Sequence, residues 1–365
     1  MKKACHITSA HSRHDIRIFH KECSSLARAG YEVTLLCADL KSDERKNGVS
    51  IKSAGCKPKN RIDRFLNSHR VLLKMALAMD SDIYHFHDPD LLSVGAALRR
   101  RGKKVIYDAH EDVPRQLKSK PWVPPCFRSV LSFIFEHYEN FFAGRFDHVI
   151  TATPYIAQRF MRINPNTTDV NNYPLSGEFD QSCEWSVRKD EACYLGGITK
   201  IRGVLEMIKA LEIANVPLHL CGEYESSEMK DLVHAMPGFS FAVDHGFLPR
   251  NEAQGILRSC KAGLVTYLPE ENHISAQPNK LFEYMAAGVP VIASDFPLWK
   301  TIVEGNNCGF CVDPENPKAI ATALTTILSD DGLAKAMGEN GRMAVEGIYN
   351  WTSQEKKLLQ IYSTI

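Results

Sequence analysis

Residues 275–295 read SAQPNKLFEYMAAGVPVIASD, and this stretch is the clearest indication of the fold. Leu281 and Met285 recur at helical spacing soon after Pro278, a residue type that suits the first turn of a helix. Gly288 then supplies the residue type that commonly ends one. The pattern predicts a short helix that begins after Pro278 and ends at Gly288.

A compact apolar run, formed by Val291, Ile292 and Ala293, follows this helix. Such runs are typical of buried strands in parallel sheets. Ligands of open α/β sheets bind outside the carboxyl ends of the strands, and the amino end of a helix offers free N–H groups to an anion. The unit therefore suits a phosphate-bearing ligand, and Glu283, one turn into the helix, could accept hydrogen bonds from the ligand's hydroxyl groups.

Size and composition limit the class of protein. A chain of 365 residues exceeds the length at which single cores usually split, so we expect two domains. The net charge of +1 argues against a nucleic-acid protein held by bulk charge. Eleven cysteines without the spacing of a secreted scaffold favour reduced thiols. His6, His11 and Arg13 interrupt any signal peptide, and no apolar run reaches the ~20 residues that span a bilayer, so we expect a cytoplasmic protein.

The amino half alternates apolar runs with amphipathic ones. A helix predicted over residues 16–29 separates the first two strands and makes a βαβ unit. The predicted strands of this half are 4–9, 33–38, 49–53, 83–87, 105–109 and 148–152. Such alternation predicts a doubly wound parallel sheet.

Three polar loops follow strands of this sheet, over residues 10–15, 85–88 and 110–112. Because the carboxyl ends of parallel strands meet at one edge, these loops should share one rim. The candidate cleft residues on this rim are His11, Arg13, His14 and His87.

The alternation stops in a polar stretch without period, which we interpret as a linker over residues 175–190. A second series follows, with a helix over 204–213 and strands at 192–195, 218–221, 240–243, 263–266, 289–293 and 309–312. The sequence therefore predicts two Rossmann-like α/β domains, over 1–174 and 191–349. An amphipathic helix over 350–365 could fold back onto the first domain.

Five segments, in this order, resemble one known family: HITSAHSRHDIRIFHKE, YHFHDPDLL, VIYDAHE, YLGGITKIRG and PNKLFEYMAAGVPVIASD. They are similar to bacterial GT-B glycosyltransferases of the large retaining family 4. The resemblance implies two doubly wound domains with an interdomain cleft, and sugar transfer from a nucleotide-diphosphate sugar, with UDP expected, to a glycan or lipid-linked acceptor. It implies no metal and no cofactor. Relatives build capsule, O-antigen or exopolysaccharide.

The resemblance also implies a donor site in the carboxyl half. Glu283 matches the family's ribose-binding glutamate, whereas Ser275 stands where a first glutamate would hold the donor sugar. Arg202, or Lys200 in its place, would stabilise the charge that grows on the departing diphosphate. The implied donor site comprises Gly196, Gly197, Lys200, Arg202, Ser275, Asn279, Lys280, Leu281 and Glu283.

In the amino half, His110 resembles the family's histidine near the donor sugar. The resemblance implies a positioning or cation-stabilising role for His110, rather than that of a base, with Asp15 and Glu111 in support. Two other functions stay open, a nucleotide-sugar epimerase on the same fold and a non-catalytic sensor of nucleotide sugars. Product analysis would separate all three.

Two motifs resemble a metal site and a redox site, but we expect both to have structural explanations. Asp88 and Asp90 imitate a metal site, but we expect one of them to cap the helix that begins at Leu91. Cys308 and Cys311 imitate a redox dithiol, yet they lie on a predicted strand rather than at the start of a helix.

Basic and aromatic residues mix in two runs, over 57–79 and 115–146. Ordinary packing of helices against the sheet would explain both. In the second run, many aromatic side chains beside basic ones also suit an acceptor site at an anionic membrane surface, so we expect peripheral association with the inner face of the cell membrane.

Overall fold

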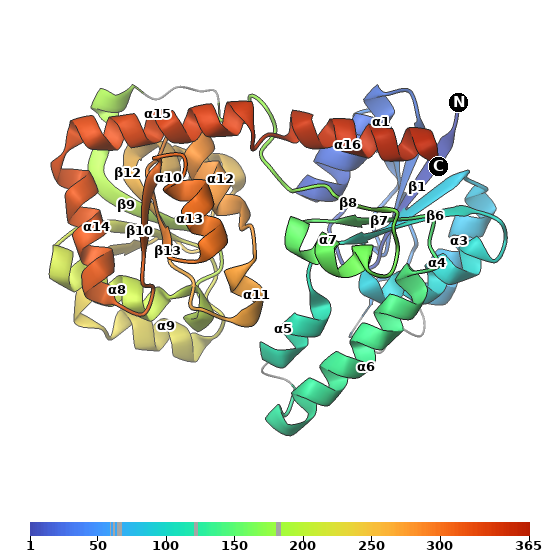
Figure 1. Cartoon of the computed structure of the whole chain (residues 1–365), viewed down its shortest axis with the longest axis horizontal. Coiled ribbons are helices and arrows are strands. Elements are labelled where there is room, and N and C mark those ends of the chain that lie inside the picture. The colour runs from blue at the N-terminus through green and yellow to red at the C-terminus, as the bar shows by residue number, and fades with distance from the viewer. Residues whose placement is uncertain (59, 61–62, 64–67, 120–122, 180–183) are drawn as a thin grey trace. The chain divides into compact units, whose positions relative to one another are not determined.

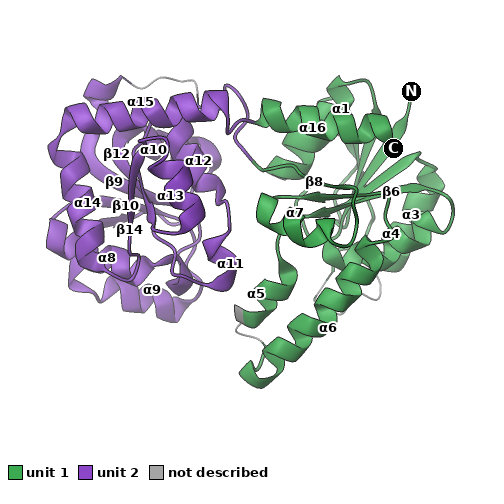
Figure 2. Ribbon diagram, viewed as in Figure 1, with its two compact units in different colours: residues 1–172, 351–365 green, residues 173–350 purple. Residues whose placement is uncertain are grey.

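The computed structural model in Figure 1 describes residues 1–58, 60, 63, 68–119, 123–179 and 184–365. The chain forms two compact units, coloured separately in Figure 2. The first unit contains Met1–Asn172 and Trp351–Ile365, and the second contains Tyr173–Asn350. The predicted domain limits, 1–174 and 191–349, lie near these boundaries.

The first unit is built on an eight-stranded sheet with the order β3-β4-β2-β1-β5-β6-β7-β8. All neighbours are parallel except β3 and β4. Its strands are β1 (Lys3–Thr8), β2 (Glu32–Cys37), β3 (Glu44–Lys46), β4 (Val49–Ser53), β5 (Ile83–Phe86), β6 (Lys104–Ala109), β7 (His148–Thr151) and β8 (Thr167–Asp169).

Helices cover both faces of this sheet (Figure 1). The described helices are η1 (Ile16–Cys23), α1 (Ser24–Arg28), α3 (His69–Met79), η3 (Pro89–Leu91), α4 (Leu92–Arg99), α5 (Val113–Ser119), α6 (Pro125–Ala143), α7 (Pro154–Met161) and α16 (Trp351–Thr364). Helix α16 belongs to this unit although the chain enters it from the second. Its Trp351 is buried and donates through Nε1 to Ser25 Oγ at 2.9 Å.

The second unit has a six-stranded parallel sheet with the order β11-β10-β9-β12-β13-β14. Its strands are β9 (Lys189–Leu195), β10 (Leu218–Cys221), β11 (Ala242–Asp244), β12 (Cys260–Val265), β13 (Val291–Ser294) and β14 (Gly309–Val312). Its helices are η4 (Trp185–Val187), η5 (Lys200–Arg202), α8 (Val204–Ala214), α9 (Ser227–His234), η6 (Pro237–Phe241), α10 (Arg250–Ser259), α11 (Glu271–Ile274), α12 (Asn279–Ala286), α13 (Pro297–Val303), α14 (Pro317–Ser329) and α15 (Asp331–Gly347).

The structure confirms two doubly wound α/β sheets and corrects several details. The first two residues of the predicted strand at 240–243 belong to the 3-10 helix η6, and the last two belong to β11. Strands β3 and β8 were not predicted, because each has three residues. Strand β9 begins at Lys189, inside the stretch predicted as linker. The helix predicted over 16–29 is a π-helix followed by one short α-helix.

Candidate functional site

A buried lysine lies at the amino end of α12 in the second unit. Lys280 is 7% exposed, and its Nζ has no hydrogen-bond partner among the described residues. The ammonium lies 3.6 Å from the ring centroid of Tyr194 and 5.4 Å from that of Tyr267. Burial, followed by the like charge of Arg202, lowers the pKa of Lys280 well below its usual value. A buried cation without a counter-ion is costly, so this position is prepared for an anion.

The loop after β9 can lie this close because it contains glycine. A Cβ atom on Gly196 would meet Lys280 Nζ at 3.1 Å, and one on Gly203 would meet the Thr266 carbonyl oxygen at 2.0 Å. Both glycines also have positive φ, at 121° and 76°. Any larger residue at Gly203 would push the loop off the end of β12.

Arg202 brings a second cation to this loop. Its Nη1 donates to the Gly197 carbonyl at 3.3 Å, and a Cβ on Gly197 would meet the same Nη1 at 2.9 Å. Lys200 is exposed instead, and its backbone N–H donates to Glu225 at 3.0 Å. The geometry therefore favours Arg202 over Lys200 as the partner of Lys280.

The predicted donor-site residues in and before α12 differ in how accessible they are to a ligand. Leu281 is buried, and its N–H donates to the Pro278 carbonyl at 3.1 Å, which makes that amide a poor donor for a ligand. Asn279 is exposed at the first position of the helix. Ser275 is half-buried between α11 and α12.

Glu283 does not stand alone. Its Oε1 accepts a hydrogen bond of 2.9 Å from Arg250 Nη2, and Arg250 also donates through Nε to Glu178 at 2.8 Å. The Glu283 side chain remains 22% exposed. Arg250 thus fixes the direction of a carboxylate that a ligand can still reach.

Several polar groups of this rim were missed by the sequence analysis. Buried oxygen atoms without a partner among the described residues occur at Thr199, Thr266, Asn272 and Gln277. They lie after β9, after β12, within α11 and just before α12. Their positions after strands were the only signal in the sequence, and single threonines or amides at such places are too common to be predictive.

A surface depression of about 420 Å³ continues this rim at the ends of β10 and β11. Gly222, Tyr224 and Phe247 are among its lining residues, and Phe247 is largely exposed. A Cβ on Gly222 would meet the Gly196 carbonyl oxygen at 2.1 Å. The depression therefore adjoins the loop after β9, in which Gly196 lies beside Lys280.

In the first unit, His110 directly follows β6. Its Nε2 lies 2.8 Å from Asp108 Oδ2, and the side chain is 15% exposed. Asp108 is fully buried, and Arg17 binds both its oxygens, through Nε at 2.9 Å and Nη2 at 2.8 Å. Asp108 was missed because it occupies the penultimate position of an otherwise apolar strand.

The π-helix η1 explains how Arg17 reaches Asp108. A π-helix brings residues five apart onto one face, and it places Arg17 Nε 3.2 Å from Glu22 Oε1. Asp15 caps this helix and accepts from the N–H groups of Arg17 and Ile18 at 2.8 and 2.9 Å. The main role of Asp15 in this structure is therefore to cap the helix that holds Arg17, although it lies 3.6 Å from His11.

The other predicted residues of this rim separate into two groups. His11 lies beside His110, with ring centroids 4.9 Å apart, and is partly exposed. Glu111 is exposed and accepts from Gln116. Arg13 and His14, by contrast, bind Glu44 of β3, and Arg13 also binds Asp39, so both hold the β3 hairpin rather than a ligand.

His87 corrects another expectation. It is 1% exposed and lies behind His110, so it cannot touch an acceptor. The expectation for Asp88 and Asp90 is also corrected, because Asp88 stands at the N-cap position of η3 but neither side chain accepts a capping hydrogen bond. Asp88 accepts from Thr8 Oγ1 at 2.8 Å and Ser9 N at 2.7 Å, and Asp90 accepts from Ser9 Oγ at 2.8 Å.

Four buried side chains behind this rim lie close enough together to hold a metal ion, namely His6, Glu22, His85 and His87. The rings already contact one another, and His6 Nδ1 lies 2.9 Å from His87 Nε2. All ten cysteines of the described residues, Cys308 and Cys311 included, are free thiols.

Two family models match the chain. The model described as glycosyl transferases group 1 matches residues 178–344, and that of Glycosyltransferase Family 4 matches residues 17–170. Together they span most of both units. The chain is a family 4 glycosyltransferase with the GT-B fold.

Relatives with known names agree with this assignment. An uncharacterized glycosyltransferase of Methanocaldococcus jannaschii is 26% identical over 202 residues, which are 51% of this chain and 50% of the relative. The capsular polysaccharide biosynthesis glycosyltransferase CapM of Staphylococcus aureus is 26% identical over 182 residues, 47% of this chain and 45% of CapM. This glycosyltransferase thus spans about half the length of the curated relatives it matches.

A solved structure extends the comparison over the whole fold. HepE of Anabaena, solved in complex with UDP-glucose, superimposes on the glycosyltransferase with a TM-score of 0.74. The alignment covers 100% of both chains at 14% identity, so it shows the fold alone.

Helix α6 of the glycosyltransferase carries an exposed apolar face, formed by Phe127, Val130, Phe133, Ile134 and Phe141. Each of these side chains is more than half exposed. Figure 1 shows the amino end of α6 extending away from the sheet of the first unit. The inner face is anchored by buried Glu139, which accepts from Tyr107 Oη at 2.7 Å. In the other predicted run, 57–79, residues 59, 61–62 and 64–67 lie outside the described residues, and His69–Met79 form α3.

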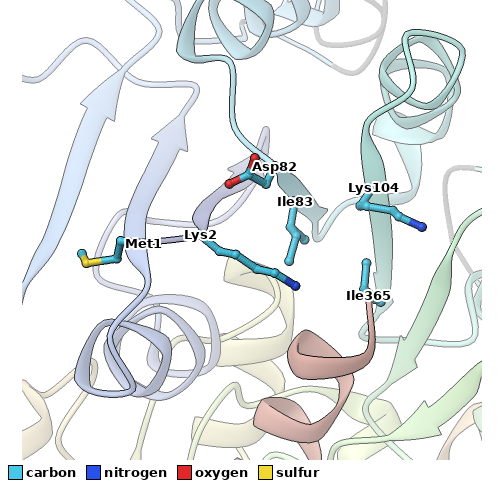
Figure 3. Close-up of a pocket in the computed structure, with 6 residues that line it drawn as sticks. All are labelled: Met1, Lys2, Asp82, Ile83, Lys104 and Ile365. Carbon is cyan, nitrogen blue, oxygen red and sulfur yellow. The ribbon is translucent and has the colours of Figure 1, made fainter.

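One further depression, of about 310 Å³, lies at the opposite edge of the first sheet (Figure 3). Lys2, Asp82 and Lys104 line it, at or before the first residues of β1, β5 and β6. Ligands of such sheets bind at the carboxyl ends, so we do not include this depression in the site. Among the described helices, none combines the length and the apolar character needed to cross a bilayer.

Proposed function

We propose that this enzyme transfers a sugar, with retention of configuration, from a nucleotide-diphosphate sugar to a glycan or lipid-linked acceptor in cell-surface polysaccharide synthesis. Uridine diphosphate is the expected nucleotide. The observation that carries the proposal is Lys280, a buried ammonium without a partner among the described residues at the amino end of α12. The UDP-glucose bound by HepE and the capsule synthesis named for CapM support the choice of substrates.

The chemistry needs positive charge where the diphosphate departs. Breaking the bond between sugar and phosphate adds a negative charge to the terminal phosphate of the departing nucleoside diphosphate, and fixed cations in a dry site stabilise that charge most strongly. Lys280 and Arg202 supply two such cations beside the Gly196 loop. An arriving phosphate would also restore the ordinary charged state of Lys280, whose pKa burial lowers.

The nucleoside would extend from this phosphate site along the same rim. Glu283, oriented by Arg250, is the proposed partner of the ribose hydroxyls. The depression beside Phe247 is the proposed place of the base, because an exposed aromatic ring offers a stacking surface. Ser275 is the proposed contact of the donor sugar.

The first unit would bind the acceptor. In a same-face transfer, the departing phosphate helps to deprotonate the acceptor, and His110 positions or stabilises the reacting sugar. His11 and Glu111 are proposed to contact the acceptor or His110. The exposed apolar face of α6, with Lys118, Arg128 and Arg145 close to it in the sequence, is the proposed contact with an anionic membrane surface that carries a lipid-linked acceptor.

Product analysis tests the proposal. A thermal-shift panel of UDP, GDP, ADP and CMP sugars identifies the donor, because a ligand of the folded state raises the melting temperature. Release of nucleoside diphosphate should then require an acceptor and survive EDTA, and NMR of the product should show the donor's anomeric configuration. Epimerised sugar without acceptor would identify an epimerase. Binding without any turnover would identify a sensor.

A further inference from the structure

Four aromatic rings behind His110 form a continuous hydrogen-bonded chain. Tyr362 Oη on α16 lies 2.9 Å from His85 Nδ1 and 3.0 Å from His6 Nε2. The other nitrogen of His6, Nδ1, lies 2.9 Å from His87 Nε2. His87 Nδ1 in turn lies 3.1 Å from Asp108 Oδ2, the same oxygen that His110 contacts. His6 uses a different nitrogen for each of its two neighbours, and His87 Nδ1 also lies 3.3 Å from His110 Nε2, beside the carboxylate oxygen that both rings contact.

The charge at the end of the chain is fixed. Burial alone would raise the pKa of Asp108, but Arg17 and His110 outweigh burial, and the pKa lies well below the usual range. Burial lowers the pKa values of His6, His85 and His87. The chain therefore ends on a carboxylate anion and runs through neutral imidazole rings.

An anionic carboxylate can only accept hydrogen bonds, and this sets the direction of the whole chain. His87 must donate from Nδ1 to Asp108, which leaves its Nε2 as an acceptor for His6 Nδ1–H. His6 Nε2 then accepts from Tyr362 O–H. The reverse direction would place a lone pair of His87 against the carboxylate at 3.1 Å.

The far end of the chain agrees with this direction. Tyr362 Oη, having donated to His6, accepts from His85 Nδ1–H, which leaves a lone pair on His85 Nε2. That nitrogen has no hydrogen-bond partner among the described residues and lies 3.9 Å from Glu22 Oε2. The Glu22 carboxyl group, whose pKa is raised by burial and by the nearby Asp108, faces this unused lone pair.

We propose that Asp108 is a positioning residue: it holds His110 in the tautomer protonated at Nε2, so that Nδ1 is the nitrogen that meets the ligand. The same carboxylate fixes His6, His85 and His87 as Nδ1–H tautomers. Arg17 holds Asp108 in place through two hydrogen bonds. The proposal rests on the proposed function only in giving His110 a ligand to meet.

Nitrogen-15 NMR of the histidine rings in the full-length protein tests the tautomers directly. On the alkaline side of the ring titrations, His6, His85 and His87 should be protonated at Nδ1 and His110 at Nε2. His110 protonated at Nδ1 would overturn the proposal. Stoichiometric zinc bound to His6, His85 or His87 would also overturn it, because a metal would take the lone pairs that the chain uses.

Asp108→Asn tests the consequence for turnover. Arg17 would bind the amide oxygen, so the NH2 group would face His110 Nε2 and favour the opposite tautomer. By analogy with other carboxylate–histidine pairs, kcat should fall roughly hundredfold or more. Affinity for UDP should not change, since the proposed phosphate site lies in the other unit. Unchanged kcat would overturn the proposal.

If Asp108→Asn does not fold, the spectrum of the wild-type protein still decides. A wild type that folds, shows the stated tautomers and transfers no sugar would reject the proposed function while leaving the tautomers established.

Tyr362→Phe tests whether Asp108 or Tyr362 determines the direction of the hydrogen bonds and therefore the histidine tautomers. Removing this hydroxyl should change the ring signals of His6 and His85 but leave those of His110 unchanged, because Asp108 remains. A change in the tautomer of His110 would show that α16 sets the chain, and would overturn the assignment to Asp108. Tyr31→Phe is the matched control, since its ring lies 5.5 Å from that of Tyr362 but takes no part in the chain.

Discussion

Two buried cations in this protein are treated in opposite ways. Arg17 in the first unit is 4% exposed and has a carboxylate on both sides, Asp108 at 2.8 Å and Glu22 at 3.2 Å. Lys280 in the second unit is 7% exposed and has aromatic rings around its ammonium but no carboxylate within hydrogen-bonding distance among the described residues. The Coulombic attraction of its carboxylates outweighs burial and raises the pKa of Arg17, whereas burial lowers that of Lys280.

This difference separates a structural charge from a binding charge. A buried cation with its counter-ion supplied by the chain completes the fold, and removing it leaves an unpaired carboxylate. A buried cation without a counter-ion makes the free protein less stable, and this cost in free energy is offset only when an anion binds. In the proposed function, the first unit would use its buried charge to position His110, and the second would use its own to receive phosphate.

Exchanging each cation for methionine should give the largest contrast. Arg17→Met should lower the free energy of unfolding by about 3–5 kcal/mol, because Asp108 and Glu22 lose their partner in a dry interior. Lys280→Met should leave stability unchanged or raise it, because the free protein loses a buried amino group that has no hydrogen-bond partner among the described residues. Urea unfolding of both variants measures the difference. An equal loss in both would remove the distinction between the two sites.

Acid should destabilise the first unit through its buried histidines. Burial lowers the pKa values of His6, His85 and His87, so below about pH 6.5 the unfolded chain binds protons that the folded one refuses. Glu22, with its raised pKa, offsets one of the three. The free energy of unfolding should therefore fall as the pH drops below about 6.5, with a slope that approaches about 3 kcal/mol per pH unit near pH 5. A flat profile there would mean that the rings are not held neutral.

Replacing Glu283 tests the nucleoside end of the second site. Hydrogen bonds to a charged group contribute roughly 1.5–3 kcal/mol, so Glu283→Ala should weaken binding of the nucleoside diphosphate about tenfold to hundredfold. Glu178→Ala is the matched control, because it also removes a partner of Arg250 but lies outside the proposed ribose contact. Equal effects of the two variants in calorimetry would assign Glu283 a structural role.

The exposed face of α6 should give the smallest effect. Phe133→Ser should weaken binding to vesicles that contain phosphatidylglycerol by roughly three- to tenfold, as expected for partial burial of one ring. High salt should weaken binding as well. Met343→Ser, which removes an equally exposed apolar side chain on α15, should change nothing. Vesicle binding that is absent at every salt concentration would make α6 an ordinary surface helix.

Local patterns in the sequence predicted most of the fold. The apolar run at 291–293 and the helical spacing of Leu281 and Met285 are complete within a few residues, and both elements lie within three residues of their predicted ends. The π-helix η1 could not be predicted, because its amphipathic pattern is interpreted with the period of an α-helix. What distinguishes it is that Arg17 contacts both Glu22, five residues on, and Asp108, and the contact with Asp108 joins distant parts of the chain.

The site was less predictable for the same reason. Lys280 was placed at the donor site, but the burial of its ammonium depends on Gly196, which approaches from another strand. Asp108 has no motif of its own, and its importance follows from contacts with Arg17 and His110. Arg13 and His87 were expected at the rim, yet the structure gives them partners inside the first unit.

The most direct test of the central claim follows the proton of Lys280. Calorimetric titration with the nucleoside diphosphate, in buffers of different ionisation enthalpy, counts the protons taken up on binding. If the phosphate restores the charge of Lys280, the wild type should take up more protons than Lys280→Met at alkaline pH and should bind far more tightly. Equal proton uptake and equal affinity in the two proteins would show that the buried ammonium is not the phosphate's partner.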